Sequence, residues 1–214
     1  MSLENVIARH ELRRAGAPPA RAKGVVLLIH GRGATAESML PLADVLAMPD
    51  LCYLAPQAAG HSWYPQSFMA PTDANEPYLT RALNRVAAII GDITEAGTEA
   101  ARLAVIGFSQ GACLTSETVL RNPAPYGFIG ILSGGAIGPP GTPRDYAGSL
   151  AGAGVFLGCS DHDPHIPLGR VQETTQLMIR MGARVTERIY PGASHTINDD
   201  EISHLRAGLS ALPM

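Results

Sequence analysis

A serine between two glycines is the first residue whose setting points to chemistry. Ser109 lies in the stretch LAVIGFSQGACL, residues 103–114, with Gly107 and Gly111 two positions away on either side. The pattern G-x-S-x-G can hold a nucleophilic serine on a sharp strand-to-helix turn, where larger side chains at the glycine positions would clash. The alternative is that Ser109 only caps a helix. Because the chain has 23 glycines, the pattern alone is a weak signal and the rest of the chain has to decide.

The partners that a nucleophilic serine needs are present downstream in a suitable order. A serine hydroxyl becomes reactive when a histidine takes its proton and a carboxylate orients that histidine. Asp161 and Asp163 follow an apolar run at residues 154–157, and His195 follows the segment 183–190. The order serine, acid, histidine is the one found with this type of serine turn. On residue type and position, Asp161 and Asp163 are both candidates for the acid.

A second glycine-rich turn, in LLIHGRGATAES at residues 27–38, is suited to assist the same reaction. Attack on an ester creates an oxyanion, which two backbone N–H groups must be ready to bind. Gln110, directly after the serine, can supply one N–H, and Arg32 in HGRG can supply the other. HGRG lacks the Lys-Ser/Thr ending of a P-loop and the GxGxxG spacing, which disfavours a nucleotide site.

These turns require a scaffold that brings the ends of several strands together. Continuous apolar runs predict strands buried on both faces at residues 25–29, 103–106, 127–132 and 154–157. Helical apolar spacing predicts helices within residues 79–93, 168–178 and 198–212. Alternation of polar residues in 183–190 predicts a half-exposed strand near the sheet edge. Strands and helices in alternation predict an α/β sheet with helices on both faces and a ligand site at the carboxyl ends of the strands.

The composition fits one domain over residues 1–214, because 46% of the 214 residues are hydrophobic and only 16% are charged. A net charge of -3 gives no electrostatic case for binding nucleic acid. The sequence has no apolar stretch long enough for a signal peptide or a membrane span, so we expect a cytoplasmic protein. Cys52, Cys113 and Cys159 lie far apart at apolar segments and are expected to be reduced core residues.

A long segment without helical or strand period, residues 56–77, is a candidate for the substrate wall. It carries Trp63, Tyr64, Phe68 and Met69. We expect these side chains to form an apolar wall for the acyl group beside the serine. The alternative is that the aromatic residues pack as a satellite core beneath the loop.

Six stretches together resemble the phospholipase/carboxylesterase branch of the α/β-hydrolases, which includes the acyl-protein thioesterases. They are HGRG, APQAAGHSWYPQSF, GFSQGA, LSGG, DHDPHIP and PGASH, and the likeness runs from about Gly24 to the C-terminus. The resemblance implies an α/β-hydrolase fold, with a mostly parallel central sheet, helices on both faces and no separate cap domain. It also implies a carboxylesterase, lysophospholipase-like or acyl-thioesterase-like serine hydrolase that needs no cofactor and no metal.

Residue by residue, the resemblance makes Ser109 the nucleophile, His195 the base, and Arg32 and Gln110 the oxyanion donors. It favours Asp163 as the acid, because the acid of the family directly precedes a proline, as Asp163 precedes Pro164. The expected partner is a small-molecule ester or thioester of small to medium acyl size, and assembly into a homodimer is open.

Two positions depart from the thioesterases, in which the counterparts of Arg32 and His165 are usually apolar. His165 and its neighbour Ile166 are expected at the entrance of the substrate site. One rival hypothesis is a metal-dependent hydrolase whose ligands would be Asp161, His162, Asp163 and His165. The other is a non-catalytic α/β-hydrolase that binds a small ligand or partner. A serine-directed phosphonate separates the three hypotheses.

Overall fold

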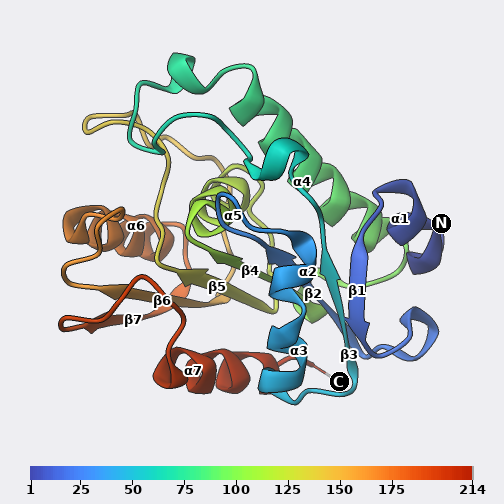
Figure 1. The fold of residues 1–214 in the computed structure, drawn as a ribbon. Helices are drawn as coiled ribbons and strands as arrows, with labels where there is room; N and C mark the ends of the chain where they lie inside the picture. The colour runs from blue at the N-terminus through green and yellow to red at the C-terminus, as the bar shows by residue number, and fades with distance from the viewer. Residues whose placement is uncertain (214) are drawn as a thin grey trace.

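The computed structural model describes residues 1–213 and places seven strands in one sheet, in the order β1-β3-β2-β4-β5-β6-β7 (Figure 1). The strands are β1 (Arg13–Gly16), β2 (Gly24–Ile29), β3 (Leu51–Ala55), β4 (Leu103–Phe108), β5 (Phe128–Leu132), β6 (Gly154–Ser160) and β7 (Arg184–Tyr190). Only β1 runs antiparallel to its neighbour; the other five pairs of strands are parallel. The predicted mostly parallel α/β sheet is therefore confirmed.

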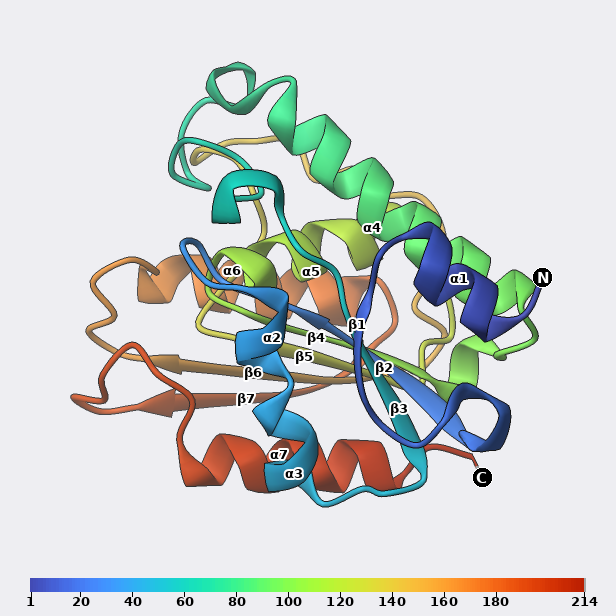
Figure 2. The same cartoon turned by 45° about the vertical axis from the view of Figure 1, so that its right-hand side comes forward.

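Seven α-helices cover the two faces of the sheet within the described residues. They are α1 (Leu3–Arg9), α2 (Ala36–Met39), α3 (Pro41–Leu46), α4 (Tyr78–Glu95), α5 (Gln110–Arg121), α6 (Leu168–Arg180) and α7 (Asp199–Ser210). Helices α2, α3 and α7 lie on one face, and α1, α4, α5 and α6 lie on the other (Figures 1 and 2). Within residues 1–213 the helices pack on the sheet and no separate cap domain is present.

The continuous apolar runs arise because the central strands have a core on each side. In β2, Leu27 and Ile29 belong to the core beneath α4 and α5, whereas Val26 and Leu28 belong to the core beneath α2, α3 and α7. Side chains of a strand point alternately to opposite faces, so both sets must be apolar. The edge strand β7 is only half-buried, with exposed and partly buried residues in alternation, as its sequence predicts.

Helix ends follow local signals in the sequence. Asn198 caps α7 by accepting a hydrogen bond from the Glu201 N–H, and the Glu201 carboxylate accepts one from the Asn198 N–H. This capping box starts α7 directly after the loop that carries His195. Residues 56–77 form a long connection with two short 3-10 turns, η2 (Ala59–His61) and η3 (Thr72–Asn75).

The three cysteines are free and buried, as expected for core residues. Burial raises the pKa of Cys52 to about 11 and that of Cys113 and Cys159 to about 12, which keeps the three thiols protonated at neutral pH. In the part of the chain that the structure describes, no helix is both long and apolar enough to cross a membrane.

Candidate active site

Ser109 lies on the turn between β4 and α5, at the carboxyl edge of the sheet. Its backbone angles, φ 55° and ψ −121°, are ones that a residue with a side chain rarely adopts. Glycine is required on both sides of this turn. A Cβ at Gly107 would meet the carbonyl of Gly111, and a Cβ at Gly111 would meet the carbonyl of Ile29. The two glycines of the G-x-S-x-G pattern therefore allow three backbone segments to approach closely.

A continuous chain of hydrogen bonds links Ser109 to a histidine and a carboxylate. The Ser109 hydroxyl lies 2.9 Å from Nε2 of His195, and Nδ1 of His195 lies 2.6 Å from the carboxylate of Asp163. An ionised carboxylate can only accept, so Nδ1 carries the proton and Nε2 is free to accept from the serine. His195 comes from the β7–α7 loop and Asp163 from the β6–α6 loop. Three turns at the carboxyl edge of the sheet thus bring together residues that are far apart in the chain.

The environment of Asp163 keeps its carboxylate charged. Its side chain is fully buried, and one oxygen accepts the N–H groups of His165 at 2.8 Å and Ile166 at 3.0 Å. Burial alone would raise the pKa of Asp163, but the hydrogen bonds from His195 and the two backbone N–H groups outweigh it and lower the pKa. A charged Asp163 can orient His195 and stabilise its protonated form.

The second candidate acid, Asp161, has a different set of contacts. Its carboxylate accepts the N–H of Gly192 at 2.8 Å and pairs with the exposed ring of His162 at 2.8 Å. These interactions lower the pKa of Asp161, with the Gly192 N–H as the main cause. Asp161 therefore ties together the loops that carry Asp163 and His195, and has no recorded hydrogen bond to His195 itself.

The HGRG turn lies against the serine, as an oxyanion site requires. A Cβ at Gly31 would be 3.2 Å from the Cβ of Ser109, so Gly31 packs directly against the serine. Arg32 is the next residue in the chain after Gly31. The N–H of Gln110 is the first of α5 and has no preceding helical turn to bond to. Among the recorded hydrogen bonds of the described chain, the N–H of Arg32 likewise has no acceptor.

His30 holds this turn in shape. It is fully buried, its Nε2 accepts the N–H of Ala58 at 3.0 Å, and its Nδ1 lies 2.7 Å from the carbonyl of Gly31. The proton is therefore on Nδ1, and burial lowers the pKa of His30. A neutral His30 can make both bonds at once, so it acts as a support for the turn.

The side chains of Arg32 and Gln110 both reach the long connection 56–77. Gln110 accepts the N–H of Trp63 at 3.0 Å and donates to the carbonyl of Tyr64 at 2.8 Å. Arg32 donates to the carbonyls of Pro65 at 2.7 Å and Gln66 at 2.6 Å. The two residues predicted as oxyanion donors are thus anchored through their side chains to the same loop.

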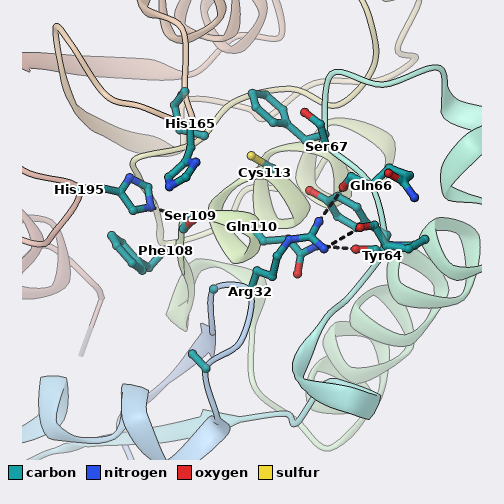
Figure 3. A pocket seen from close by; sticks show the side chains of 15 residues that line it. Arg32, Tyr64, Gln66, Ser67, Phe108, Ser109, Gln110, Cys113, His165 and His195 are labelled. Atoms are coloured by element: carbon teal, nitrogen blue, oxygen red, sulfur yellow. Dashed lines mark hydrogen bonds between the residues drawn. The ribbon is translucent and has the colours of Figure 1, made fainter.

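A cavity of about 450 Å³ opens beside Ser109 and His195 (Figure 3). Of the six predicted substrate-binding residues, four line it, namely Tyr64, Phe68, His165 and Ile166. Phe108, Gln66, Ser67 and Cys113 also line it and were not predicted. The sequence contains a signal for two of these: Phe108 directly precedes Ser109, and Cys113 follows it by one helical turn. Gln66 and Ser67 had no signal beyond their presence in the long connection.

Trp63 and Met69 lie outside the set of lining residues. The Trp63 side chain is 4% exposed, and its indole N–H donates to the carbonyl of His30 at 2.8 Å. Its ring also packs on His30, with the ring centroids 5.1 Å apart. Met69 is partly buried against the same core. The structure therefore places Trp63 behind the turn that carries Arg32, and Trp63 does not line the cavity as expected.

The four residues of the metal hypothesis are not gathered around a common point. Within residues 1–213, no three His, Cys, Asp or Glu side chains lie close enough to hold a metal ion. Asp163 is occupied by His195, and His162 is 84% exposed and paired with Asp161. The donor geometry favours the serine hypothesis over the metal one.

Several known proteins are similar to this chain in fold and, to a lesser degree, in sequence. The chain is 40% identical to a phospholipase/carboxylesterase from Dyadobacter fermentans, with a TM-score of 0.89 over 93% of this chain and 95% of that one. It is 26% identical to esterase PE8, with a TM-score of 0.79 over 94% and 98% of the two chains. A probable carboxylesterase, SOBER1-like, from Arabidopsis thaliana is 22% identical over 88% of this chain and 78% of the relative. The model of the phospholipase/carboxylesterase family matches residues 13–212, and the chain belongs to this family of α/β-hydrolases.

Proposed function

We propose that the protein hydrolyses carboxylic esters, and thioesters of similar acyl size, through a Ser109–His195–Asp163 triad. The observation that carries the proposal is the unbroken chain of hydrogen bonds from the serine hydroxyl, through both ring nitrogens of His195, to a buried carboxylate. Esterases and carboxylesterases among its relatives support the reaction class.

The geometry suits a two-step reaction through an acyl-enzyme. His195 Nε2 takes the proton of Ser109 as Oγ attacks the carbonyl carbon, and the N–H groups of Arg32 and Gln110 bind the oxyanion. His195 then gives the proton to the leaving alkoxide or thiolate, which leaves the acyl group on Ser109. Water attacks this ester with His195 again as base, and the carboxylic acid is released with Ser109 restored.

The cavity supports small to medium acyl groups as substrates. Its volume of about 450 Å³ is at the lower end of ligand sites, and residues 1–213 form no cap domain that would enclose a long chain. Tyr64, Phe68 and Ile166 provide apolar surface on its walls. We therefore expect activity to peak at short to medium chains in a panel of ester and thioester substrates.

A serine-directed fluorophosphonate and two variants test the proposal. Wild-type protein should gain one adduct by intact-mass spectrometry, with the adduct mapped to Ser109, and Ser109→Ala should gain none. Ser109→Ala and His195→Ala should each lower kcat by about 10⁴- to 10⁶-fold, and the double variant should be little worse because the residues act as a unit. Labelling at another residue, or Ser109→Ala with more than about a tenth of the activity, would refute the assignment.

A further inference from the structure

Arg32 is the only permanently charged residue among the 15 described residues that line the cavity beside Ser109, although the chain as a whole has a net charge of -3. Burial raises the pKa of Tyr64 and of Cys113, so these two lining residues stay uncharged at neutral pH. Arg32, His165 and His195 line it, and none of its 15 lining residues within the described chain is Asp or Glu. The nearest carboxylate in the hydrogen-bond chain, Asp163, is fully buried behind His195 and is paired with it. The positive charge of Arg32 therefore favours a negatively charged group in the part of the cavity that lies next to it.

The guanidinium group of Arg32 has more hydrogen-bond donors than its contacts to the loop use. Nη1 donates to Ser62 Oγ at 3.2 Å and to the Pro65 carbonyl, and Nη2 donates once, to the Gln66 carbonyl. A guanidinium has five N–H groups, so Nε–H and one N–H of Nη2 have no recorded partner. In a planar guanidinium these two groups form one edge, and their spacing matches the two oxygens of a carboxylate. The contacts to the loop hold that edge in a fixed position.

The reaction geometry decides which part of a substrate meets this edge. The leaving group must lie beside His195, because His195 Nε2 gives it a proton. Figure 3 shows His195 and His165 on one side of Ser109 and Arg32 on the other. The acyl group points away from the leaving group, and the part of the cavity away from His195 is the part next to Arg32 (Figure 3).

The geometry points to esters whose acyl group ends in a carboxylate, the half-esters of short dicarboxylic acids, as the preferred substrates. The inference rests on the proposed serine hydrolase function and specifies its substrate class. The apolar walls contact the methylene groups of such an acyl chain, and the free edge of Arg32 binds its distal carboxylate. Arg32 then has two roles in one residue, with its backbone N–H at the oxyanion and its side chain at the far end of the acyl group.

A structural role for the Arg32 side chain alone is the competing explanation, since it also braces the loop at Pro65 and Gln66. The two roles predict different substrate dependence. Loss of a brace lowers kcat/KM for charged and neutral esters alike. Loss of a carboxylate-binding edge lowers kcat/KM for the half-ester further than any loss that the two esters share. The ratio of kcat/KM values for monoethyl glutarate and ethyl valerate therefore isolates the proposed role.

The experiment measures this ratio for wild-type protein, Arg32→Gln, Arg32→Lys and the control Arg21→Gln. Arg21 is exposed and lies just before the amino end of β2, at the opposite edge of the sheet. Wild-type protein should prefer monoethyl glutarate, and added salt should reduce that preference. Arg32→Gln should lower the ratio by about 10- to 100-fold, Arg32→Lys should lower it less, and Arg21→Gln should leave it unchanged.

Three results would overturn the inference: a wild-type preference for ethyl valerate, a ratio that Arg32→Gln does not change, or an equal fall in Arg21→Gln. Each of these leaves hydrolysis of ethyl valerate and labelling of Ser109 intact. If the proposed function itself is wrong, neither ester is hydrolysed and Ser109 is not labelled, so the two failures can be distinguished. Monoethyl succinate and monoethyl adipate, run beside the glutarate, locate the distance at which Arg32 acts.

Discussion

Replacement of Asp163 by asparagine tests the proposed triad with the smallest change in shape. One oxygen of Asp163 accepts two backbone N–H groups, from His165 and Ile166, and the other accepts Nδ1–H of His195. An asparagine must keep its oxygen toward the two N–H groups, since its NH₂ cannot accept from them. The NH₂ then faces His195 and forces the proton from Nδ1 to Nε2. In that tautomer Nε2 cannot take the proton of Ser109.

The expected cost follows from this change of tautomer. In a serine protease the corresponding substitution lowers kcat by about 10⁴-fold, which is about 5 kcal/mol in activation free energy. We expect a loss of the same order for Asp163→Asn, measured as kcat for ethyl butyrate with ethanol release as the signal. The melting temperature, measured in parallel, shows whether the variant is folded.

Asp161→Asn is the matched control, two residues away in the same loop. An asparagine oxygen can still accept the N–H of Gly192, so the connection to the His195 loop is kept. We expect kcat to change by less than about fivefold. A folded Asp163→Asn with more than about a tenth of wild-type activity, or a greater loss in Asp161→Asn, would show that the reasoning about the acid is wrong.

Two further predictions concern stability. Trp63→Ala should lower the melting temperature by on the order of 10 °C, because it empties a buried site and leaves the His30 carbonyl unpaired; an unchanged melting temperature would contradict its place in the core. Glu201→Gln tests a buried carboxyl group whose pKa is raised to about 7 by burial. Because the folded state favours protonated Glu201, this group contributes to the unfolding free energy of the wild type fully below about pH 4, and the contribution is lost as pH rises to 7. Relative to wild type, Glu201→Gln should therefore gain up to about 3 kcal/mol of unfolding free energy between pH 5 and pH 8 in denaturant titrations, and a constant difference would contradict the pKa.

The local features of the fold could be predicted because each depends on neighbours in the chain. The runs that became β2, β4, β5 and β6 are apolar throughout, since each strand has a core on both faces. The capping residues of α7 and the alternation of exposed and partly buried residues in β7 likewise depend on only a few consecutive residues. Strand β3 was not predicted, although its run LCYLA is equally apolar and leads directly into the stretch APQAAGHSWYPQSF.

The residues that could carry the chemistry were also available from the sequence. The turn around Ser109, the order of Asp163 and His195, and the HGRG turn depend on local patterns and on chain order. Position and residue type did not separate Asp161 from Asp163. The preference for Asp163 came from its resemblance to a family pattern, and the hydrogen bond to His195 now gives it a physical reason.

Only the tertiary structure decided which side chains face the cavity. Trp63 and Tyr64 are adjacent in a loop without period, so nothing in the sequence could say that Tyr64 lines the cavity while Trp63 packs on His30. Their orientation is set by Gln110, which is 47 positions from Trp63 and holds both residues by hydrogen bonds. The free edge of Arg32 likewise depends on carbonyls more than 30 positions away. The sequence therefore determined which groups are available for chemistry, and long-range packing determined what they face.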